Sequence, residues 1–169
     1  MLYVTTRNNR ETVTSYRAMT EDRAEDGGFY VPFREPKFSK EEQKLLASMP
    51  LNQRIAEILN TLFQTNLSRW DVEFCIGRNS VKFVPLRHRI IMGEFWHNPD
   101  WNYQKTEKAL AKLLIQDYVL PGSWLKIAIR IAILAAACME LYQDSAEEVD
   151  ISMIGGDLLW FVSAWYARK

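Results

Sequence analysis

The chain has 169 residues, of which 48% are hydrophobic, so it can bury the core of one globular domain or of a small module with an appendage. Its 21 basic and 21 acidic residues cancel, which leaves no net charge to attract a polyanion. No basic run with interleaved aromatic residues is present either. Nucleic acid and membranes are therefore excluded as expected partners.

The two cysteines, Cys75 and Cys138, lie far apart in the sequence, which indicates a reducing compartment without a disulfide framework. We expect both to be packed, inert thiols on apolar helix faces. The N-terminus has no basic segment followed by a long apolar one, so no signal peptide is expected. Lys126 and Arg130 interrupt the most apolar stretch, residues 123–141, before it could span a bilayer. The expected location is the cytoplasm.

Short β-branched runs predict strands at residues 3–6 and 12–15, joined by the turn-like pair Asn8-Asn9. The triplet Asp26-Gly27-Gly28 predicts a tight turn, because glycine accepts a positive φ without steric cost. Residues 29–31 follow as a third short strand that stops at Pro32.

Three helices are predicted next. Ser39 and Glu42 have the spacing of a capping box, which starts a helix that runs to about residue 48. After Pro50, apolar residues recur at three- and four-residue steps and predict a second helix with one core-facing stripe. A third helix spans residues 68–77 and starts with a second capping pattern at Ser68 and Asp71. Its expected apolar face consists of Trp70, Phe74 and Cys75.

The second half of the chain is predicted to be mainly helical. Strands at residues 81–84 and 90–92 flank Pro85 and precede an amphipathic helix at 103–118. Its expected inward residues are Leu110, Leu113 and Leu114. Residues 124–143 predict a central apolar helix with Lys126 and Arg130 on one solvent face. An acidic connector is expected at 144–150, and a last helix at 152–169. This helix has more apolar surface than one core-facing stripe needs. We expect it to bury that surface either against the module or in a homodimer seam.

The N-terminal motifs resemble those of threonine synthases over residues 3–78. In that family a tyrosine followed by Ser-Thr-Arg-Gly opens the chain, and the motif DGGLYVP follows after a short helix. The matching stretches here are residues 3–8, with Thr5, Thr6 and Arg7, and residues 26–32, with Asp26, Gly27, Gly28, Tyr30 and Pro32. Asn8 stands where the family has glycine. The resemblance implies the fold of the family's N-terminal domain.

A weaker resemblance covers residues 94–105. The family motif ELFHGPTLAFKD contains the lysine that forms a Schiff base with pyridoxal phosphate, and here His97, Pro99 and Tyr103 align with it. In that alignment the lysine position is Gln104, whose amide cannot attack an aldehyde or shuttle protons. On a helix, the side chain of the neighbouring Lys105 points roughly 100° away from that of Gln104, so Lys105 would not take the place of the cofactor lysine. The resemblance therefore implies a protein that has lost its cofactor lysine.

Other candidate sites have simpler interpretations. His88 and His97 lack a third ligand at metal spacing, so no metal site is expected. Arg7 and Arg10, with Arg87 and Arg89, form a candidate anion site for a phosphorylated substrate, although solvated charges are the first interpretation. Tryptophans could line a pocket or a partner surface, but core packing is the first explanation for Trp96, Trp101, Trp124, Trp160 and Trp165.

These patterns predict an α+β protein with a threonine synthase N-terminal-like module at residues 1–80 and a mainly helical region at 81–169 packed on it. Since the resemblance covers no complete cofactor domain, the expected function is a non-catalytic threonine synthase-like protein without a cofactor. It would act by association with itself or with a protein partner. Two alternatives stay open: a binder of a phosphorylated amino acid, and a subunit of a split pyridoxal phosphate enzyme.

Overall fold

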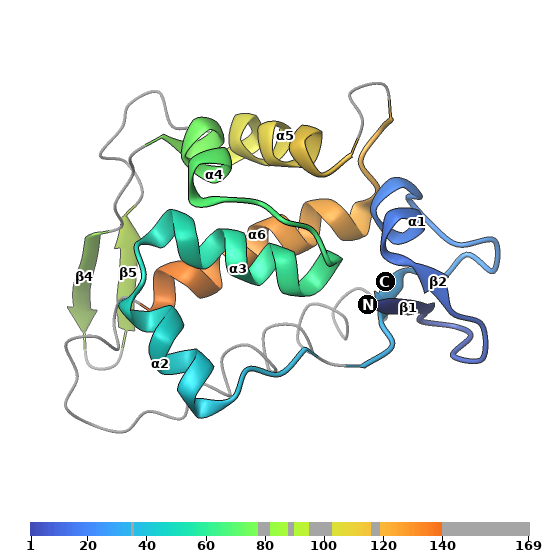
Figure 1. The fold of residues 1–169 in the computed structure, drawn as a ribbon, viewed down its shortest axis with the longest axis horizontal. Helices are drawn as coiled ribbons and strands as arrows, with labels where there is room; N and C mark the ends of the chain where they lie inside the picture. Colours follow the sequence, from blue (N-terminus) through green and yellow to red (C-terminus); the bar gives the residue numbers. More distant parts are fainter. Residues whose placement is uncertain (35, 78–81, 88–89, 95–102, 116–118, 140–169) are drawn as a thin grey trace.

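The computed structural model describes residues 1–34, 36–77, 82–87, 90–94, 103–115 and 119–139. Within these ranges a small sheet lies at one end of a group of helices, and a separate two-stranded ribbon lies at the other end (Figure 1). The α+β class predicted from the sequence is confirmed. The acidic connector and the last helix expected at 152–169 lie outside the described residues.

The N-terminal sheet has three antiparallel strands in the order β2-β1-β3. Strand β1 is Leu2–Thr5, β2 is Val13–Thr14 and β3 is Tyr30–Pro32. The three predicted strands are present, but β2 is only two residues long, and β3 begins at Tyr30 and includes Pro32, which pairs with Tyr3. Proline is accepted there because β3 is an edge strand and needs no outward N–H.

A short helix, α1 at Ser15–Thr20, follows β2 directly. The residue pattern predicted only a strand at this point, whereas the family resemblance implied a short helix ahead of the glycine turn. The Thr14 side chain accepts a hydrogen bond from the amide of Arg17 and so starts the helix. Six residues are too few to show a helical period, which explains why the pattern missed this element.

The next three helices are α2 at Lys40–Ser48, α3 at Leu51–Phe63 and α4 at Arg69–Ile76. Capping boxes formed by Ser39 with Glu42 and by Ser68 with Asp71 start α2 and α4, as the sequence predicted. The apolar stripe predicted for α3 is buried in the core. The prediction for α4 is wrong in one respect: Val72 and Ile76 face the core, while Trp70 and Phe74 are exposed.

The two-stranded ribbon pairs β4, Lys82–Arg87, with β5, Ile90–Glu94, in antiparallel register. Strand β4 continues through Pro85 rather than ending there, with a register shift between Pro85 and Arg87. A bulge and an edge position are the places where a strand accepts proline, so the expected break did not occur.

Helices α5 at Tyr103–Leu114 and α6 at Ser123–Cys138 complete the described fold. Leu110 of α5 is buried as predicted, but Leu113 is exposed, so the prediction for that residue is wrong. Helix α6 is central, as predicted, and Arg130 reaches solvent. No helix in the described part of the chain is both long and apolar enough to cross a membrane.

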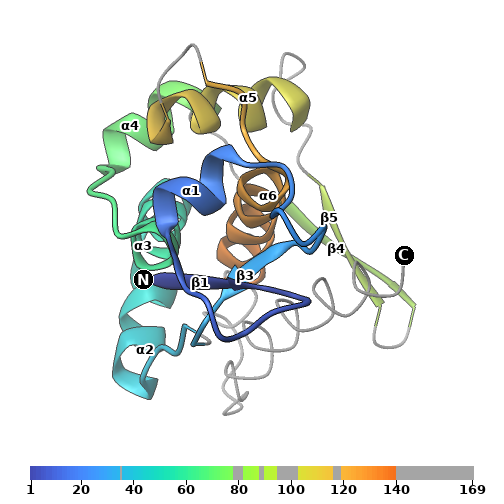
Figure 2. The ribbon, with the colours of Figure 1, turned by 90° about the vertical axis from the view of Figure 1, so that its right-hand side faces the viewer.

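One hydrophobic core joins the sheet, α3 and α6 (Figure 2). The buried ring of Tyr3 lies 6.3 Å from the ring of Phe63 in a stacked arrangement and 6.0 Å from Trp124 edge-on. Its hydroxyl donates a hydrogen bond of 2.6 Å to the carbonyl of Leu62, and burial raises the pKa of Tyr3 well above its usual range. The predicted core role of Trp124 is confirmed.

Polar contacts also fix α6 to the N-terminal elements. The amide of Gly122 donates to the carbonyl of Met19 over 2.7 Å, and the Ser123 hydroxyl donates to the carboxylate of Asp22 over 2.5 Å. A Cβ on Gly122 would lie 2.2 Å from the carbonyl oxygen of Glu21, so only glycine fits at this contact. Helix α6 is thus an integral part of the core of the N-terminal elements.

Candidate functional site

The two motif loops of the N-terminal region meet through Thr5 and Asp26. The Thr5 hydroxyl donates a hydrogen bond to the Asp26 carboxylate and accepts one of 2.8 Å from the amide of Asn8. The amide of Thr5 in turn donates to the carbonyl of Asn8 over 3.1 Å. The loop after β1 and the glycine turn before β3 therefore hold each other in place.

The glycines of the second motif are required by this contact. Gly27 has a φ of 75°, which favours glycine, and the amide of Gly28 donates to the Asp26 carboxylate over 2.7 Å. A Cβ on Gly28 would lie 2.9 Å from that carboxylate oxygen and 3.2 Å from the Cβ of Thr5. The motif therefore keeps two loops close together, and its glycines make room for that approach.

A second pair of bonds connects the same loops. The amide of Thr6 donates to the carbonyl of Phe29 over 2.8 Å, and the amide of Phe29 donates to the Thr6 hydroxyl over 3.1 Å. Hydrogen bonds from Thr5 and from the amide of Gly28 lower the pKa of Asp26, and the positive charge of Arg7 acts in the same direction. The Asp26 carboxylate is thus charged, and it accepts hydrogen bonds from the Thr5 hydroxyl and from the amide of Gly28.

The structure separates the roles of Arg7 and Arg10, which the sequence grouped as a candidate anion site. The Arg7 guanidinium donates 2.9 Å to the carbonyl of Asp26 and is tied to the motif loops. Arg10 is exposed, and its amide donates to the Asn8 side chain over 3.0 Å. Arg89 lies outside the described residues, and the side chain of Arg87 is not described. The predicted anion site stays a prediction.

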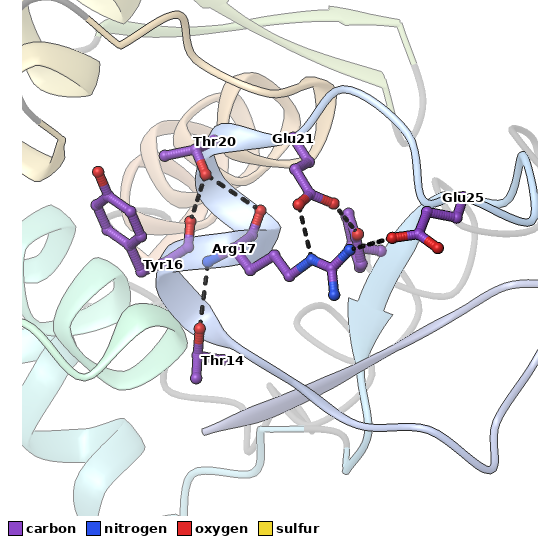
Figure 3. Close-up of polar contacts among 7 residues, drawn as sticks. Thr14, Tyr16, Arg17, Thr20, Glu21 and Glu25 are labelled. Atoms are coloured by element: carbon purple, nitrogen blue, oxygen red, sulfur yellow. Dashed lines mark hydrogen bonds and ion pairs between the residues drawn. The ribbon is translucent and has the colours of Figure 1, made fainter.

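The remaining motif tyrosine, Tyr30, belongs to a network that was not predicted from the sequence. Figure 3 shows the Arg17 guanidinium of this network between Glu21 and Glu25. The Tyr30 hydroxyl donates to the Glu21 carboxylate. The Arg17 guanidinium lies between two carboxylates, donating to Glu21 over 2.7 Å and to Glu25 over 3.1 Å. The Arg17 to Glu21 spacing of four residues on a short helix was the available signal.

Burial and the hydrogen bond to Glu21 raise the pKa of Tyr30 to about 12, so its hydroxyl stays protonated and donates. For Glu21, burial acts against ionisation, but hydrogen bonds from Tyr30 and Arg17 outweigh it and lower the pKa. The network therefore joins the start of β3 to the end of α1 with a charged carboxylate at its centre.

The position that aligns with the family lysine lies on the first turn of α5. Gln104 and Lys105 are both exposed there. Glu107, a buried residue two positions after Lys105, accepts a hydrogen bond of 2.5 Å from Arg130 and so connects α5 to α6. The aligned residues His97 and Pro99 lie outside the described residues, as does His88.

Cys75 is half-buried against the core, and burial raises the pKa of its thiol to about 11. A thiol that is protonated at neutral pH is a weak nucleophile, in agreement with the prediction that Cys75 is inert. The side chain of Cys138 is not described. Over the described ranges, no three histidine, cysteine, aspartate or glutamate side chains gather as a metal site would require.

Helix α4 exposes an aromatic pair that was predicted to face inward. Trp70 is 64% exposed and Phe74 is 89% exposed, and their spacing of four residues puts them on one face of the helix. The Arg69 guanidinium lies 5.2 Å from the centre of the Trp70 ring and forms an ion pair of 3.8 Å with Glu73. Tryptophan and phenylalanine side chains are enriched at protein–protein interfaces relative to the rest of the surface.

The three-stranded sheet, the paired motif loops and the helices packed on them define a small α+β domain. Comparison with protein families identifies it: the family model described as threonine synthase N terminus matches residues 2–79. This part of the chain is a threonine synthase N-terminal-like domain, as the two motifs predicted. No curated protein and no solved structure matches the chain significantly.

Proposed function

We propose that this protein is a non-catalytic threonine synthase-like protein that acts by binding another protein. The observation that carries the proposal is the exposed pair Trp70 and Phe74 on α4, within the residues that match the family. An aromatic side chain that becomes buried when a partner binds contributes roughly 150–250 Å² of contact area. Tryptophan is also enriched among the residues that dominate binding energy.

The helix that presents this pair is stabilised at its start and along its inner face. Its first turn is closed by the reciprocal bonds of Ser68 and Asp71, and its inner face is anchored by Val72 and Ile76 in the core. A pre-ordered aromatic surface loses little conformational entropy when a partner binds. Association is therefore the activity that this part of the domain supports best.

Two features support a non-catalytic role. First, the position that aligns with the cofactor lysine is Gln104, and an amide cannot form an imine. Second, Lys105 is exposed on the same turn of α5. A catalytic imine needs an amine that loses its proton readily in a water-excluded site, and exposure works against both conditions. This is why the split-enzyme alternative has less support.

The alternative of binding a phosphorylated amino acid has less support as well. Arg7 already donates to the Asp26 carbonyl, and the Asp26 carboxylate beside it repels an anion. Arg10 is a solvent-exposed cation, for which ion pairs contribute little. Addition of O-phosphohomoserine should therefore not raise the melting temperature of the protein.

The non-catalytic part can be tested by titrating the full chain with pyridoxal phosphate, reducing with borohydride and mapping the labelled lysines. We expect low labelling spread over exposed lysines and no change in the pattern of the other lysines in a Lys105→Gln variant. Saturable, stoichiometric labelling of one lysine, together with turnover of O-phosphohomoserine, would overturn this part of the proposal.

The association part can be tested by light scattering on a sizing column, with the full chain alone and mixed with a catalytic threonine synthase. We expect a larger species in one of the two samples, and its loss in a Phe74→Ser variant. The matched control is Leu120→Ser, which removes another side chain that is 84% exposed but lies outside α4. A monomer in both samples contradicts the proposal.

A further inference from the structure

The outer surfaces of α4 and α5 together combine aromatic and basic side chains. Helix α5 packs beside α4, and its exposed residues include Lys105, Lys108 and Lys112, spaced three and four residues apart on one face. Both helices lie at the same edge of the molecule, above α3 and α6 (Figures 1 and 2). We call the surface formed by Trp70, Phe74, Lys105, Lys108 and Lys112 the α4–α5 face.

The charges of this face are mainly positive. On α4, Glu73 pairs with Arg69, and the capping carboxylate of Asp71 is the remaining negative charge, against three exposed lysines on α5. On α5, Glu107 points inward and pairs with Arg130, so the exposed charge of that helix comes from its lysines. The face therefore complements a segment that has acidic residues next to large apolar ones.

The chain itself contains such a segment. Residues 144–157 include five acidic residues and no basic one, and residues 158–166 are rich in aromatic and aliphatic side chains. The acidic residues are Asp144, Glu147, Glu148, Asp150 and Asp157, and the large apolar ones are Leu158, Leu159, Trp160, Phe161, Val162, Trp165 and Tyr166. The segment lies outside the described residues. Its composition matches the α4–α5 face in both charge and apolar character.

Resting on the proposed function, we propose that the α4–α5 face binds residues 144–166 of a second copy of this chain. We choose a second copy over the same chain because α6, the helix that precedes the segment in sequence, packs on the inner side of α5, whereas the exposed lysines of α5 lie on the opposite side. A pair of copies that exchange the segment reciprocally forms a closed dimer.

The first test is sedimentation equilibrium of the full chain over a range of concentrations. We expect a dimer that is lost in a Trp70→Ser, Phe74→Ser double variant and in a chain that ends at residue 143. Because Trp70 and Phe74 are exposed, the double variant should keep the fold, and its circular dichroism should match that of the Leu120→Ser control. The expected loss of affinity in the double variant is at least tenfold.

The second test mixes the two defective proteins. The shortened chain keeps the face, and the double variant keeps the segment, so an equimolar mixture should form a one-to-one complex although neither protein dimerises alone. Charge reversal by Lys108→Glu in the shortened chain should weaken this complex, and added salt should weaken the unaltered complex. These results would distinguish the proposed contact from any other dimer seam.

A full chain that is monomeric at all concentrations overturns the proposal, including the case in which the segment binds its own face. A dimer that withstands the double variant overturns it as well. Binding of a catalytic threonine synthase through Phe74 by such a monomer would leave the proposed function standing, so the two failures can be told apart.

Discussion

The Arg54 guanidinium donates a hydrogen bond of 2.6 Å to the carbonyl of Ala136, although the two residues are 82 positions apart. Arg54 is only 2% exposed, and its Nε also donates to the carbonyl of Met49 over 2.7 Å. A buried cation thus joins the start of α3, inside the family domain, to the last turn of α6, outside it. A positive charge near a helix C-terminus is favourable because that end of the helix dipole is negative.

Replacing Arg54 by methionine should lower the free energy of unfolding by about 3 kcal/mol, because one buried and one partly buried carbonyl group lose a charged donor. Urea denaturation followed by circular dichroism measures the change. The exposed Arg34→Met variant is the control, and its effect should stay within about 0.5 kcal/mol. Equal effects of the two substitutions would contradict a structural role for Arg54.

A Gly122→Ala substitution should destabilise the protein by about 2 kcal/mol, since the new Cβ forces α6 away from the end of α1. The φ of Gly122 is −66°, which suits alanine. The loss of stability therefore comes from the contact with the Glu21 carbonyl and not from the backbone angle. The neighbouring Ser123→Ala variant removes one exposed hydrogen bond and should cost about 0.5 kcal/mol. Thermal unfolding of both variants compares them directly.

Acid should destabilise the protein partly through Asp26. Hydrogen bonds from Thr5 and from the amide of Gly28 lower the pKa of this carboxyl from 3.8 in the folded state. Its contribution to the free energy of unfolding is therefore fully present above pH 3.8. The contribution is lost as the pH falls through the lower, folded pKa. We expect Asp26→Asn to flatten the pH dependence of the unfolding free energy below about pH 4. An unchanged acid slope would show that the Thr5 to Asp26 contact does not contribute.

Alkylation of Cys75 at pH 8 should be slow. A pKa near 11 instead of 9.0 reduces the thiolate population about 100-fold, and the greater nucleophilicity of a basic thiolate recovers part of it. The net rate should be about tenfold below that of an unperturbed thiol. Iodoacetamide labelling followed by peptide mass spectrometry gives the rate for Cys75 separately, and unfolding in urea should restore it. Rapid labelling of the folded chain would contradict the inert role.

The sequence predicted the elements whose signals are local. The capping residues Ser39 and Ser68 fixed the starts of α2 and α4, and the glycine turn at Gly27 and Gly28 fixed the start of β3. Helix α1 was missed by the residue pattern because six residues are too short for a period. The proline within β4 was accepted by a bulge, which depends on the partner strand and not on local sequence.

The candidate site could be predicted in part. The motif residues Thr5, Asp26 and Gly28 do lie together, but their role in holding two loops follows from contacts between residues distant in sequence. The exposure of Trp70 and Phe74 could not be predicted, because eight residues of α4 contain apolar side chains on both faces. Only the packing of Val72 and Ile76 against α3 and the core decides which face is buried.

The most direct test of the central claim, that α6 completes the core of the threonine synthase N-terminal-like domain, is native-state hydrogen exchange on the full chain. The amides of Leu59 in α3 and Ile133 in α6 should exchange through one opening with the same free energy and the same dependence on denaturant. If Ile133 exchanges through a separate opening of lower free energy while Leu59 stays protected, α6 is only an appendage of the domain and the claim is wrong.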